Sequence, residues 1–324
     1  MLDSYGRNID YIRISITDRC NLRCVYCMPK DGVALVDCHD IMTFDEIERL
    51  SKIFAKNGIK KIKVTGGEPL VRLDAVNLIK NLKEIESIEQ VTLTTNGVLL
   101  EETIDELHKA GIDGINVSLD TLDRDKFAQI TRRDVLNKVW AGIKKTLTYE
   151  DINLKINCVP LKLTKDEITG LVGLAKDHKI HVRFIEMMPI GLGHNFECLP
   201  EEDTKKLIEE VYGPLEPYAK KLGNGPSHYY SLQGFKGKIG FISAISHKFC
   251  NECNRIRLTS MGFLKTCLQY NKGVDLLELM RNGANDFELE EAISKAINAK
   301  PLEHSFSSKE IDQEEVRGMS QIGG

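Results

Sequence analysis

Three closely spaced cysteines, Cys20, Cys24 and Cys27, are the residues whose types and spacing most clearly predict chemistry. Cysteine thiolates are the usual ligands of iron–sulfur clusters, and three are one short of the four that close a [4Fe–4S] cluster. The fourth iron would therefore keep an open position for a ligand that reacts. Zinc sites usually take their cysteines as C-x2-C pairs, and buried apolar cysteines would not alternate with Arg19 and Arg23. The spacing favours an iron–sulfur cluster over both alternatives.

A second group of three cysteines lies in the C-terminal part of the chain, at Cys250, Cys253 and Cys267. A zinc ribbon would need a fourth ligand, and the nearest candidate, His247, is too close in sequence to form a usual ligand pair. Zinc stays open as an alternative, but a second [4Fe–4S] cluster with its own open iron is favoured. Arg255 and Arg257 lie two apart on an expected strand, so both face one side, and their planar donor forks suit phosphate or a purine edge.

The elements that must position these residues alternate between strands and helices up to about residue 190. Apolar and polar residues alternate from Ile12 to Thr17, which is the period of a half-buried strand. We expect strands at residues 12–17, 61–65, 91–95, 114–119, 155–159 and 181–185. We expect helices at residues 43–58, 74–86, 101–110, 123–130 and 136–148, and one more after a capping box at 164–167.

Six such units predict parallel strands joined by right-handed crossovers, but they are too few for a closed eight-stranded barrel. We therefore expect an α/β fold with a partial (β/α)6 TIM-like barrel. Reactive residues of such folds lie at the C-terminal ends of the strands. The segments that follow strands here are the first cysteine group, 66–69, 94–97, 118–120 and 187–188.

Glycine and proline interrupt the chain repeatedly after residue 190, which predicts a smaller mixed lobe that carries the second cysteine group. We expect two domains, 1–190 and 191–324. Short strands are expected at 228–232, 238–243, 255–259 and 263–266. Helices are expected at 273–281 and 286–299, followed by an extended polar tail at 300–324.

Charge and composition narrow the function. The net charge of −4 over 324 residues does not favour nucleic acid or an anionic membrane as a partner. Basic residues on the expected strands nevertheless predict a polyphosphate-binding interior, although a single lysine is more often at the surface; they are Arg13, Lys61, Lys63, Lys155 and Arg183. No apolar run is long enough to cross a membrane and no leader is recognisable, so we expect a cytoplasmic protein with reduced thiols.

The first cysteine group, with Tyr26 before its last member, resembles the signature of the radical S-adenosylmethionine (SAM) superfamily. This resemblance implies that SAM chelates the open iron and that an electron from the cluster releases a 5′-deoxyadenosyl radical. The segment Gly66-Gly67-Glu68-Pro69 resembles the GGE motif of the superfamily, although alone it would suggest a simple turn. The SAM-binding positions that the resemblance implies are Tyr26, Gly67, Ser118 and Met188. By sequence alone, Met188 could equally be a core methionine.

Both cysteine groups, the arginine pair and the terminal Gly323-Gly324 together resemble the GTP 3′,8-cyclase family of molybdenum cofactor biosynthesis, over essentially the whole chain. The resemblance implies that the radical takes the hydrogen from C3′ of GTP, that C3′ bonds to C8 of guanine, and that reduction gives 3′,8-cyclo-7,8-dihydro-GTP. It also implies two [4Fe–4S] clusters, the second of which meets the guanine base. The implied nucleotide-binding residues are Arg13, Lys63, Thr94, Lys155, Arg255, Ile256 and Arg257.

The resemblance gives the Gly323-Gly324 tail a role in activity, although its composition is that of a frayed end. The implied partners are GTP, an electron donor and a cyclic pyranopterin monophosphate synthase that receives the product. A monomer or homodimer is expected, with neither nucleic acid nor membrane. Lys63 stands where many relatives are expected to carry arginine, which keeps the charge but loses the bidentate fork.

Two rival functions stay open at this stage. One is a radical SAM enzyme that modifies peptides and carries an auxiliary cluster, but such enzymes usually have more C-terminal cysteines. The other is a zinc or RNA-binding protein, which the acidic balance and the 6% aromatic content disfavour. Iron and zinc analysis would separate these classes.

Overall fold

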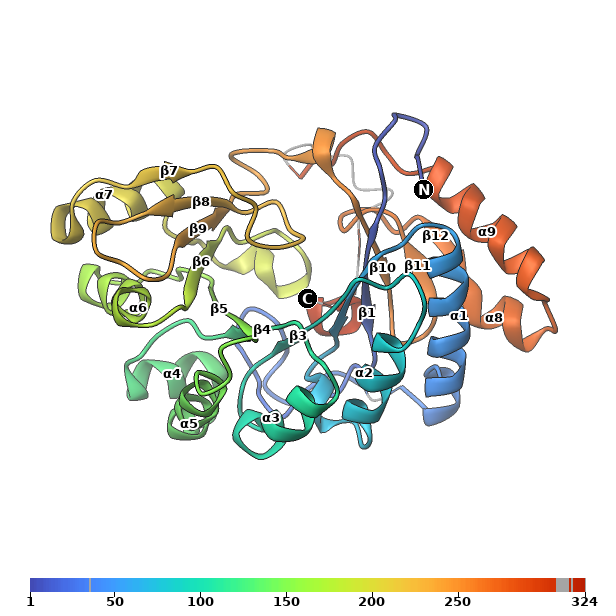
Figure 1. Cartoon of the computed structure of the whole chain (residues 1–324), viewed down its shortest axis with the longest axis horizontal. Helices are drawn as coiled ribbons and strands as arrows, with labels where there is room; N and C mark the ends of the chain where they lie inside the picture. The colour runs from blue at the N-terminus through green and yellow to red at the C-terminus, as the bar shows by residue number, and fades with distance from the viewer. Residues whose placement is uncertain (35, 307–314, 316, 324) are drawn as a thin grey trace.

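The computed structural model describes residues 1–34, 36–306, 315 and 317–323 (Figure 1). Within these residues twelve strands form one sheet. The strands are β1 (Tyr11–Ser15), β2 (Lys61–Thr65), β3 (Gln90–Thr95), β4 (Gly114–Ser118), β5 (Asn153–Cys158), β6 (His181–Ile185), β7 (Glu216–Tyr218), β8 (His228–Ser231), β9 (Ile239–Ile242), β10 (Arg255–Leu258), β11 (Phe263–Lys265) and β12 (Gly273–Asp275).

The strand order is β12-β11-β10-β1-β2-β3-β4-β5-β6-β9-β8-β7. Strands β1 to β6 pair in parallel in chain order, as the strand–helix alternation predicts. At the two sides, β10 joins β1 and β9 joins β6, again in parallel, before antiparallel hairpins complete the edges. The outermost strands β12 and β7 stand at opposite ends of this order, so the barrel is open. The predicted partial TIM-like barrel is confirmed.

The connecting helices cover the outer side of the sheet (Figure 1). They are α1 (Phe44–Lys56), α2 (Ala75–Lys83), α3 (Leu100–Lys109), α4 (Arg124–Thr131), α5 (Leu136–Thr146) and α6 (Lys165–Asp177). The later helices are α7 (Glu201–Tyr212), α8 (Leu276–Arg281), α9 (Asp286–Asn298) and α10 (Met319–Ile322), and the short 3-10 turns are η1 (Cys38–Asp40), η2 (Pro69–Val71), η3 (Gly191–Asn195) and η4 (Cys250–Glu252). No helix of the described part is long and apolar enough to span a membrane.

Local sequence explains where the helices begin. The Thr43 hydroxyl accepts from the Glu46 backbone N–H at 3.2 Å, and the Glu46 carboxylate accepts from the Thr43 N–H at 2.7 Å. Thr164 and Glu167 form the same reciprocal pair at α6. Each box satisfies two backbone donors that the first helical turn leaves open. Both predicted capping boxes are therefore confirmed.

Each central strand has one apolar and one polar side. On β1, Ile12 and Ile14 are fully buried in the core against the helix layer. Burial of one such side chain contributes roughly 1.5–3 kcal/mol. Arg13 and Ser15 alternate with them and therefore project to the concave side. The same alternation on the neighbouring strands gives the barrel a polar interior.

Four parts of the chain differ from the sequence-based expectation. The segment 273–281 is not one helix, because Val274 pairs with Leu264 in the β11–β12 hairpin and only Leu276–Arg281 is helical. The sequence analysis did not predict α7 or β7. The tail is not wholly extended, since its residues Met319–Ile322 form α10.

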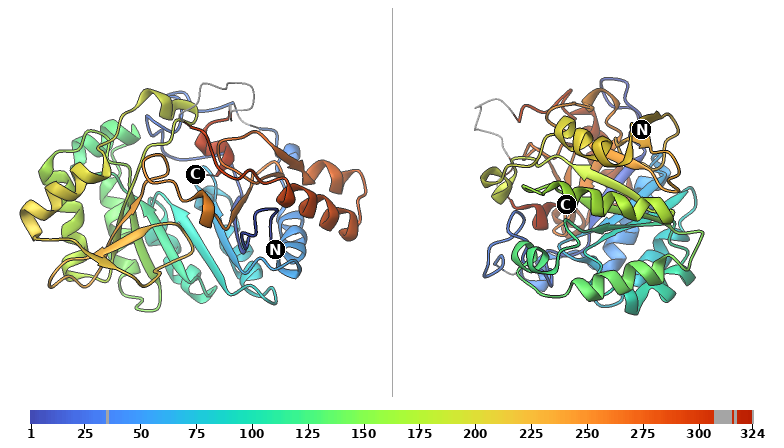
Figure 2. Two further views of the ribbon diagram at one scale, coloured as in Figure 1. Left: turned by 90° about the horizontal axis from the view of Figure 1, so that it is seen from above. Right: turned by 90° about the vertical axis from the view of Figure 1, so that its left-hand side faces the viewer.

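The expected domain boundary at residue 190 stays a prediction. The strands that follow it do not form a sheet of their own but extend the central sheet at both sides. Figure 2 shows the C-terminal end lying over the middle of the sheet. The C-terminal part of the chain is therefore part of the same structure that surrounds the barrel interior.

Candidate active site

The first cysteine group occupies the loop after β1. The backbone N–H groups of Cys27 and Met28 both donate to the Cys24 carbonyl at 3.0 Å, which folds the loop into a tight turn. Burial, and then the nearby Cys20, raises the pKa of the Cys27 thiol to about 12. Three thiols on one short loop match the donor set of a cluster with an open iron, because iron would supply the positive charge that thiolates here require.

No three His, Cys, Asp or Glu side chains in the described ranges are placed to hold one metal ion together. In a [4Fe–4S] cluster each cysteine binds a different iron. The cysteines of a cluster are therefore farther apart than the ligands of one ion. The absence of a three-ligand group among the described residues therefore concerns single metal ions only. The assignment of the cysteines to clusters stays a prediction.

The glycine motif after β2 packs against the cysteine loop. The Gly67 N–H donates to the Thr17 carbonyl at 2.7 Å and the Glu68 N–H donates to the Arg19 carbonyl at 2.8 Å. A Cβ on Gly67 would lie 2.4 Å from the Arg19 carbonyl oxygen, a distance that no side chain tolerates. Glycine is thus needed at position 67 because the backbone of the cysteine loop lies so close. The role of Gly67 in binding SAM stays a prediction.

Glu68 is a buried carboxylate that the sequence analysis did not single out. Its side chain accepts from the Thr95 hydroxyl at 2.8 Å, the Asn96 N–H at 2.6 Å and the Leu70 N–H at 3.1 Å. Burial raises its pKa to about 7. Asn96 in turn donates to Asn21 of the cysteine loop at 2.7 Å. Glu68 therefore links the ends of β2 and β3 below the cysteine loop, and its place in the glycine motif was the available signal.

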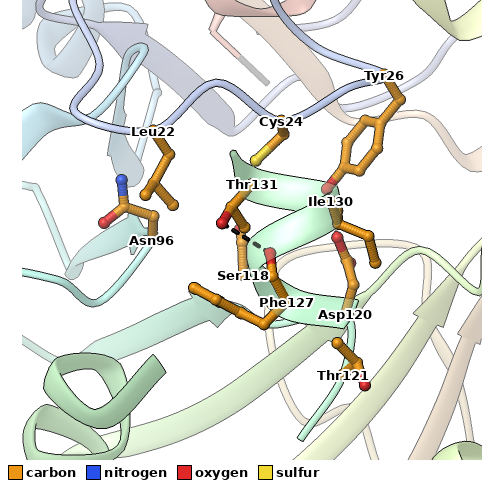
Figure 3. Close-up of a pocket in the computed structure, with 10 residues that line it drawn as sticks. All are labelled: Leu22, Cys24, Tyr26, Asn96, Ser118, Asp120, Thr121, Phe127, Ile130 and Thr131. Carbon is orange, nitrogen blue, oxygen red and sulfur yellow. Dashed lines mark hydrogen bonds between the residues drawn. The ribbon is translucent and has the colours of Figure 1, made fainter. Parts of the chain in front are cut away.

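A cavity of about 30 Å³ lies beside the cysteine loop (Figure 3). Its lining includes Cys24, Tyr26, Ser118 and Asp120. The Tyr26 hydroxyl donates to the Asp120 carboxylate at 2.7 Å, and the other oxygen of Asp120 accepts from the Val159 N–H at 2.9 Å. Burial raises the pKa of Asp120 to about 6. The structure thus brings the predicted SAM residues Tyr26 and Ser118 to one cavity.

Met188 lies elsewhere on the same mouth of the barrel. It follows β6, and its carbonyl accepts from the Ile190 N–H at 2.8 Å. Gly193 packs so closely that a Cβ there would lie 2.5 Å from the Met188 carbonyl oxygen. The backbone at Met188 is therefore held in place, but Met188 does not line the cavity of Figure 3.

Cations from three neighbouring strands lie in one row across the barrel interior. The register pairs Arg257 on β10 with Arg13 on β1, and Arg13 with Lys63 on β2. Paired residues on adjacent strands project to the same face. Lys155 on β5 and Arg183 on β6 add two more buried cations to this interior. The predicted gathering of basic residues is therefore seen at these positions.

Electrostatics indicate that this interior needs an anion. Burial, followed by repulsion from Arg13, Arg183 and Lys155, lowers the pKa of Lys63 well below its usual value. Burial and Arg183 lower the pKa of Lys155 to about 7. Lys61, in contrast, lies on the same strand as Lys63 but pairs with Asp10 at 2.8 Å. A multiply charged anion would relieve the repulsion among the interior cations.

The remaining predicted nucleotide residues differ in position. Thr94 on β3 accepts from the Asn116 side chain at 3.4 Å and is in register with it. Arg255 lies beside the second cysteine group, with its guanidinium 4.8 Å from the Phe249 ring centroid. Ile256 is 1% exposed and belongs to the hydrophobic core. The Ile256 side chain is therefore unavailable to a ligand, and this residue could contact a nucleotide through its backbone only.

The second cysteine group begins at η4. The Cys253 N–H donates to the Cys250 carbonyl at 3.1 Å, and Arg255 lies 3.9 Å from the Cys253 sulfur. Burial alone would raise the pKa of the Cys253 thiol, but Arg255 and Lys300 outweigh it and lower the pKa to about 7. The alternative zinc ligand His247 instead faces Glu201 at 3.6 Å. Arg255 thus favours the thiolate form of Cys253, the form that binds iron, while a cluster on this group stays a prediction.

Two described parts of the C-terminal tail, Glu315 and residues 317–323, contact strands of this interior. Glu315 forms an ion pair with Lys265, and the two side chains are at most 1% exposed. Farther along, the Gly323 carbonyl accepts from Arg257 at 2.7 Å, and a Cβ on Gly323 would lie 2.7 Å from the Thr65 hydroxyl. The predicted return of the tail to the site is seen for Gly323, whereas Gly324 lies outside the described residues.

Comparison with known proteins agrees with this architecture. Residues 14–201 match the Radical SAM superfamily and residues 180–306 match the Molybdenum Cofactor Synthesis C family. A crystal structure of Streptococcus suis SuiB bound to S-adenosylmethionine has a TM-score of 0.63 at 18% identity, covering 90% of this chain and 68% of that one. The fold and the cysteine loop thus define a radical SAM protein, which uses a [4Fe–4S] cluster and SAM.

The relatives narrow this class further. The GTP 3′,8-cyclase of Clostridium perfringens (strain 13 / Type A) is 49% identical over 325 residues, covering 100% of both chains. The GTP 3′,8-cyclase of Syntrophomonas wolfei subsp. wolfei is 46% identical over 328 residues, again covering 100% of both. The chain belongs to the GTP 3′,8-cyclase family of radical SAM enzymes.

Proposed function

We propose that this chain converts GTP to (8S)-3′,8-cyclo-7,8-dihydroguanosine 5′-triphosphate, the first step of molybdenum cofactor biosynthesis. The observation that carries the proposal is the row Arg257–Arg13–Lys63 inside the barrel. Buried cations that lie side by side repel one another, and burial together with this repulsion lowers the pKa of Lys63 and of Arg257. Their gathering therefore supports a polyanionic ligand. The row spans β10, which follows Cys253, β1, which precedes Cys20, and β2. The names of the full-length relatives support a guanine nucleotide as that ligand.

The first cluster and SAM would be held at the mouth beyond β1. Cys20, Cys24 and Cys27 would bind the cluster, which together with SAM supplies a carbon-centred radical able to abstract hydrogen. The residues that would hold SAM are Tyr26, Gly67, Ser118 and Met188. The Asp120 carboxylate accepts a hydrogen bond from the Tyr26 hydroxyl at 2.7 Å and so fixes the Tyr26 ring.

The interior cations would bind the nucleotide. Arg13, Lys63 and Lys155 face the phosphates, while Arg255 and Arg257 lie nearer the second cysteine group. Thr94 offers a hydroxyl from β3, and Ile256 offers its backbone. Arginine suits bidentate contact with phosphate, whereas Lys63 provides a point charge. The tail would complete the site, because Gly323 contacts Arg257 at 2.7 Å.

A second [4Fe–4S] cluster on Cys250, Cys253 and Cys267 is part of the proposal. Reconstituted protein should contain roughly eight irons and no zinc per chain. The Cys267→Ser variant should retain roughly four irons, because the first cysteine group is intact. Zinc in the purified protein, or loss of all iron in the variant, would contradict two separate clusters.

The test of the reaction is an anaerobic incubation of reconstituted protein with SAM, dithionite and GTP, followed by mass spectrometry. A product with the mass of GTP that converts to a fluorescent pterin on acid oxidation, together with 5′-deoxyadenosine, is expected. Formation of 5′-deoxyadenosine with GTP unchanged would overturn the substrate. Another crystal structure of SuiB contains a precursor peptide. That structure does not support the peptide-modifying alternative for this chain, because a likeness at 16% identity concerns the fold alone. An electron donor and a pterin synthase as partners stay predictions.

A further inference from the structure

The loop at residues 219–227, between β7 and β8, reaches the barrel interior at one point. The Lys155 ammonium, on β5, donates a hydrogen bond to the Leu222 carbonyl. A Cβ on Gly223 would lie 2.7 Å from the Lys155 Nζ atom and 3.8 Å from its Cε. The loop therefore touches Lys155 at the charged end of its side chain, and a Cβ at position 223 would displace that end.

The neighbouring glycine of the loop provides a contrast. A Cβ on Gly225 would meet nothing within 4 Å. Neither Gly223 nor Gly225 has the positive φ that favours glycine. Gly223 thus leaves the Lys155 ammonium in its observed place without any special backbone conformation, while Gly225 faces open space.

The surroundings explain why Lys155 needs such support. Arg183 from β6 repels its ammonium, and Lys63 from β2 and His181 from β6 feel the charge of Lys155 in turn. A buried ammonium without an acceptor would move away from these groups or lose its proton. An ammonium has three donors, so Lys155 can keep the Leu222 carbonyl and still offer two donors to a ligand.

We propose that Leu222 and Gly223 position the Lys155 ammonium for the phosphates of the nucleotide. Leu222 supplies the acceptor that holds the charged end inside the barrel, and Gly223 supplies the space. This role rests on the proposed function, because it assigns Lys155 to the phosphates. The exposed loop at residues 219–227, which lies outside the central barrel strands, would then contribute to nucleotide affinity.

The test compares Gly223→Ala with Gly225→Ala, the same change two positions apart on one exposed loop. The methyl group at 223 displaces Nζ, so the GTP dissociation constant, measured by equilibrium dialysis on anaerobic holoenzyme at pH 7, should rise about tenfold, the loss of one charged hydrogen bond. Gly225→Ala should bind GTP like the wild type. Gly225→Ala should also cleave SAM at the wild-type rate without GTP.

The pH dependence separates positioning from a general loosening of the loop. Lys155 has a pKa of about 7, and only its charged form attracts phosphate, so affinity should fall as the pH rises above 7. Without the Leu222 acceptor the ammonium is less stabilised, and its pKa is lower. The decline should therefore begin at a lower pH in Gly223→Ala, while Gly225→Ala should follow the wild-type curve.

Equal GTP affinities and equal pH profiles for the two variants would overturn the positioning role. Inorganic tripolyphosphate serves as a second probe. If wild-type protein binds tripolyphosphate but not GTP, and Gly223→Ala weakens tripolyphosphate binding, the positioning role stands and the proposed substrate fails. If the wild type binds neither anion, both proposals are overturned.

Discussion

At the scale of single residues, the buried cations of the barrel interior lower the folding stability of the free protein and favour the binding of an anion. Lys63 is 7% exposed, and every charged group that shifts its pKa is itself a cation. Two residues earlier, Lys61 has the carboxylate of Asp10. The two lysines have the same side chain on the same strand, but only one is left for a ligand to neutralise. Such local electrostatic conflict is typical of binding sites.

Replacing Lys63 with Met should separate its effect on GTP affinity from its effect on folding stability. We expect Lys63→Met to weaken GTP binding roughly 10–100-fold, since a charged hydrogen bond contributes about 1.5–3 kcal/mol. The ligand-free variant should unfold at a higher temperature, because a buried, repelled cation is removed. Calorimetry with and without GTP measures both. Lys61→Met is the control and should leave GTP affinity unchanged; equal losses in both variants would contradict the assignment of Lys63.

Nucleotide binding should take up protons. The pKa of Lys155 is about 7 in the ligand-free protein, so at pH 8 it is mostly neutral. A bound polyphosphate favours the charged form and raises the pKa, so the protein gains a proton on binding. Isothermal titration at pH 8 in two buffers of different ionisation enthalpy measures this uptake. Lys155→Met should reduce it, and identical heats in both buffers for the wild type would contradict the prediction.

At the scale of elements, the cysteine loop depends on the turn after β2. Gly67 and Glu68 donate backbone hydrogen bonds to the Thr17 and Arg19 carbonyls. The segment that leads into the first cysteine group is therefore docked on the end of another strand. The Glu68 carboxylate then joins this turn to the end of β3.

Gly67→Ala should disrupt this docking. The added Cβ would lie 2.4 Å from a backbone oxygen, so the cysteine loop must shift. We expect a lower iron content after reconstitution and a destabilisation of about 1–3 kcal/mol, as for other overpacked sites. Gly170→Ala is the control, because its Cβ would meet only Leu122 at 3.9 Å and alanine favours the helix. Full iron loading in Gly67→Ala would contradict the docking role.

At the scale of the whole molecule, the C-terminal part completes the barrel interior. It places β10 beside β1 and β9 beside β6. In the tail, Glu315 contacts Lys265 and Gly323 contacts Arg257. Arg317 adds a second ion pair to Glu315 at 2.8 Å. The open barrel thus receives strands and tail from sequence far beyond its six central units.

The Glu315 ion pair should anchor the tail. Glu315→Gln would leave Lys265 buried without its counter-charge, which costs about 3–5 kcal/mol. We expect a lower unfolding temperature and loss of GTP cyclisation, with SAM cleavage in the absence of GTP retained. Glu303→Gln is the matched control, since Glu303 pairs with Lys248 on the surface at 3.2 Å and such pairs contribute at most about 1 kcal/mol. Cyclisation at the wild-type rate in Glu315→Gln would contradict the anchor.

The amino-acid sequence by itself determined what depends on neighbours within a few residues. The six central strands, the capping boxes at Thr43 and Thr164, and the spacing within each cysteine group follow from local periodicity and local hydrogen bonding. The analysis of the region after residue 190 missed α7, although residues 201–212 contain neither glycine nor proline. It also missed β7, a three-residue strand that is ordered by its pairing with β8 and not by its own pattern.

Only the tertiary structure decided which distant residues meet. The pairing of β10 with β1 places Arg257 beside Arg13, and packing places the Leu222 carbonyl on Lys155 and the Arg19 carbonyl on Gly67. No local pattern encodes these contacts, since each depends on the register of strands and on the path of loops that join remote segments. The sequence therefore predicts the chemistry of the groups, and the fold sets their geometry.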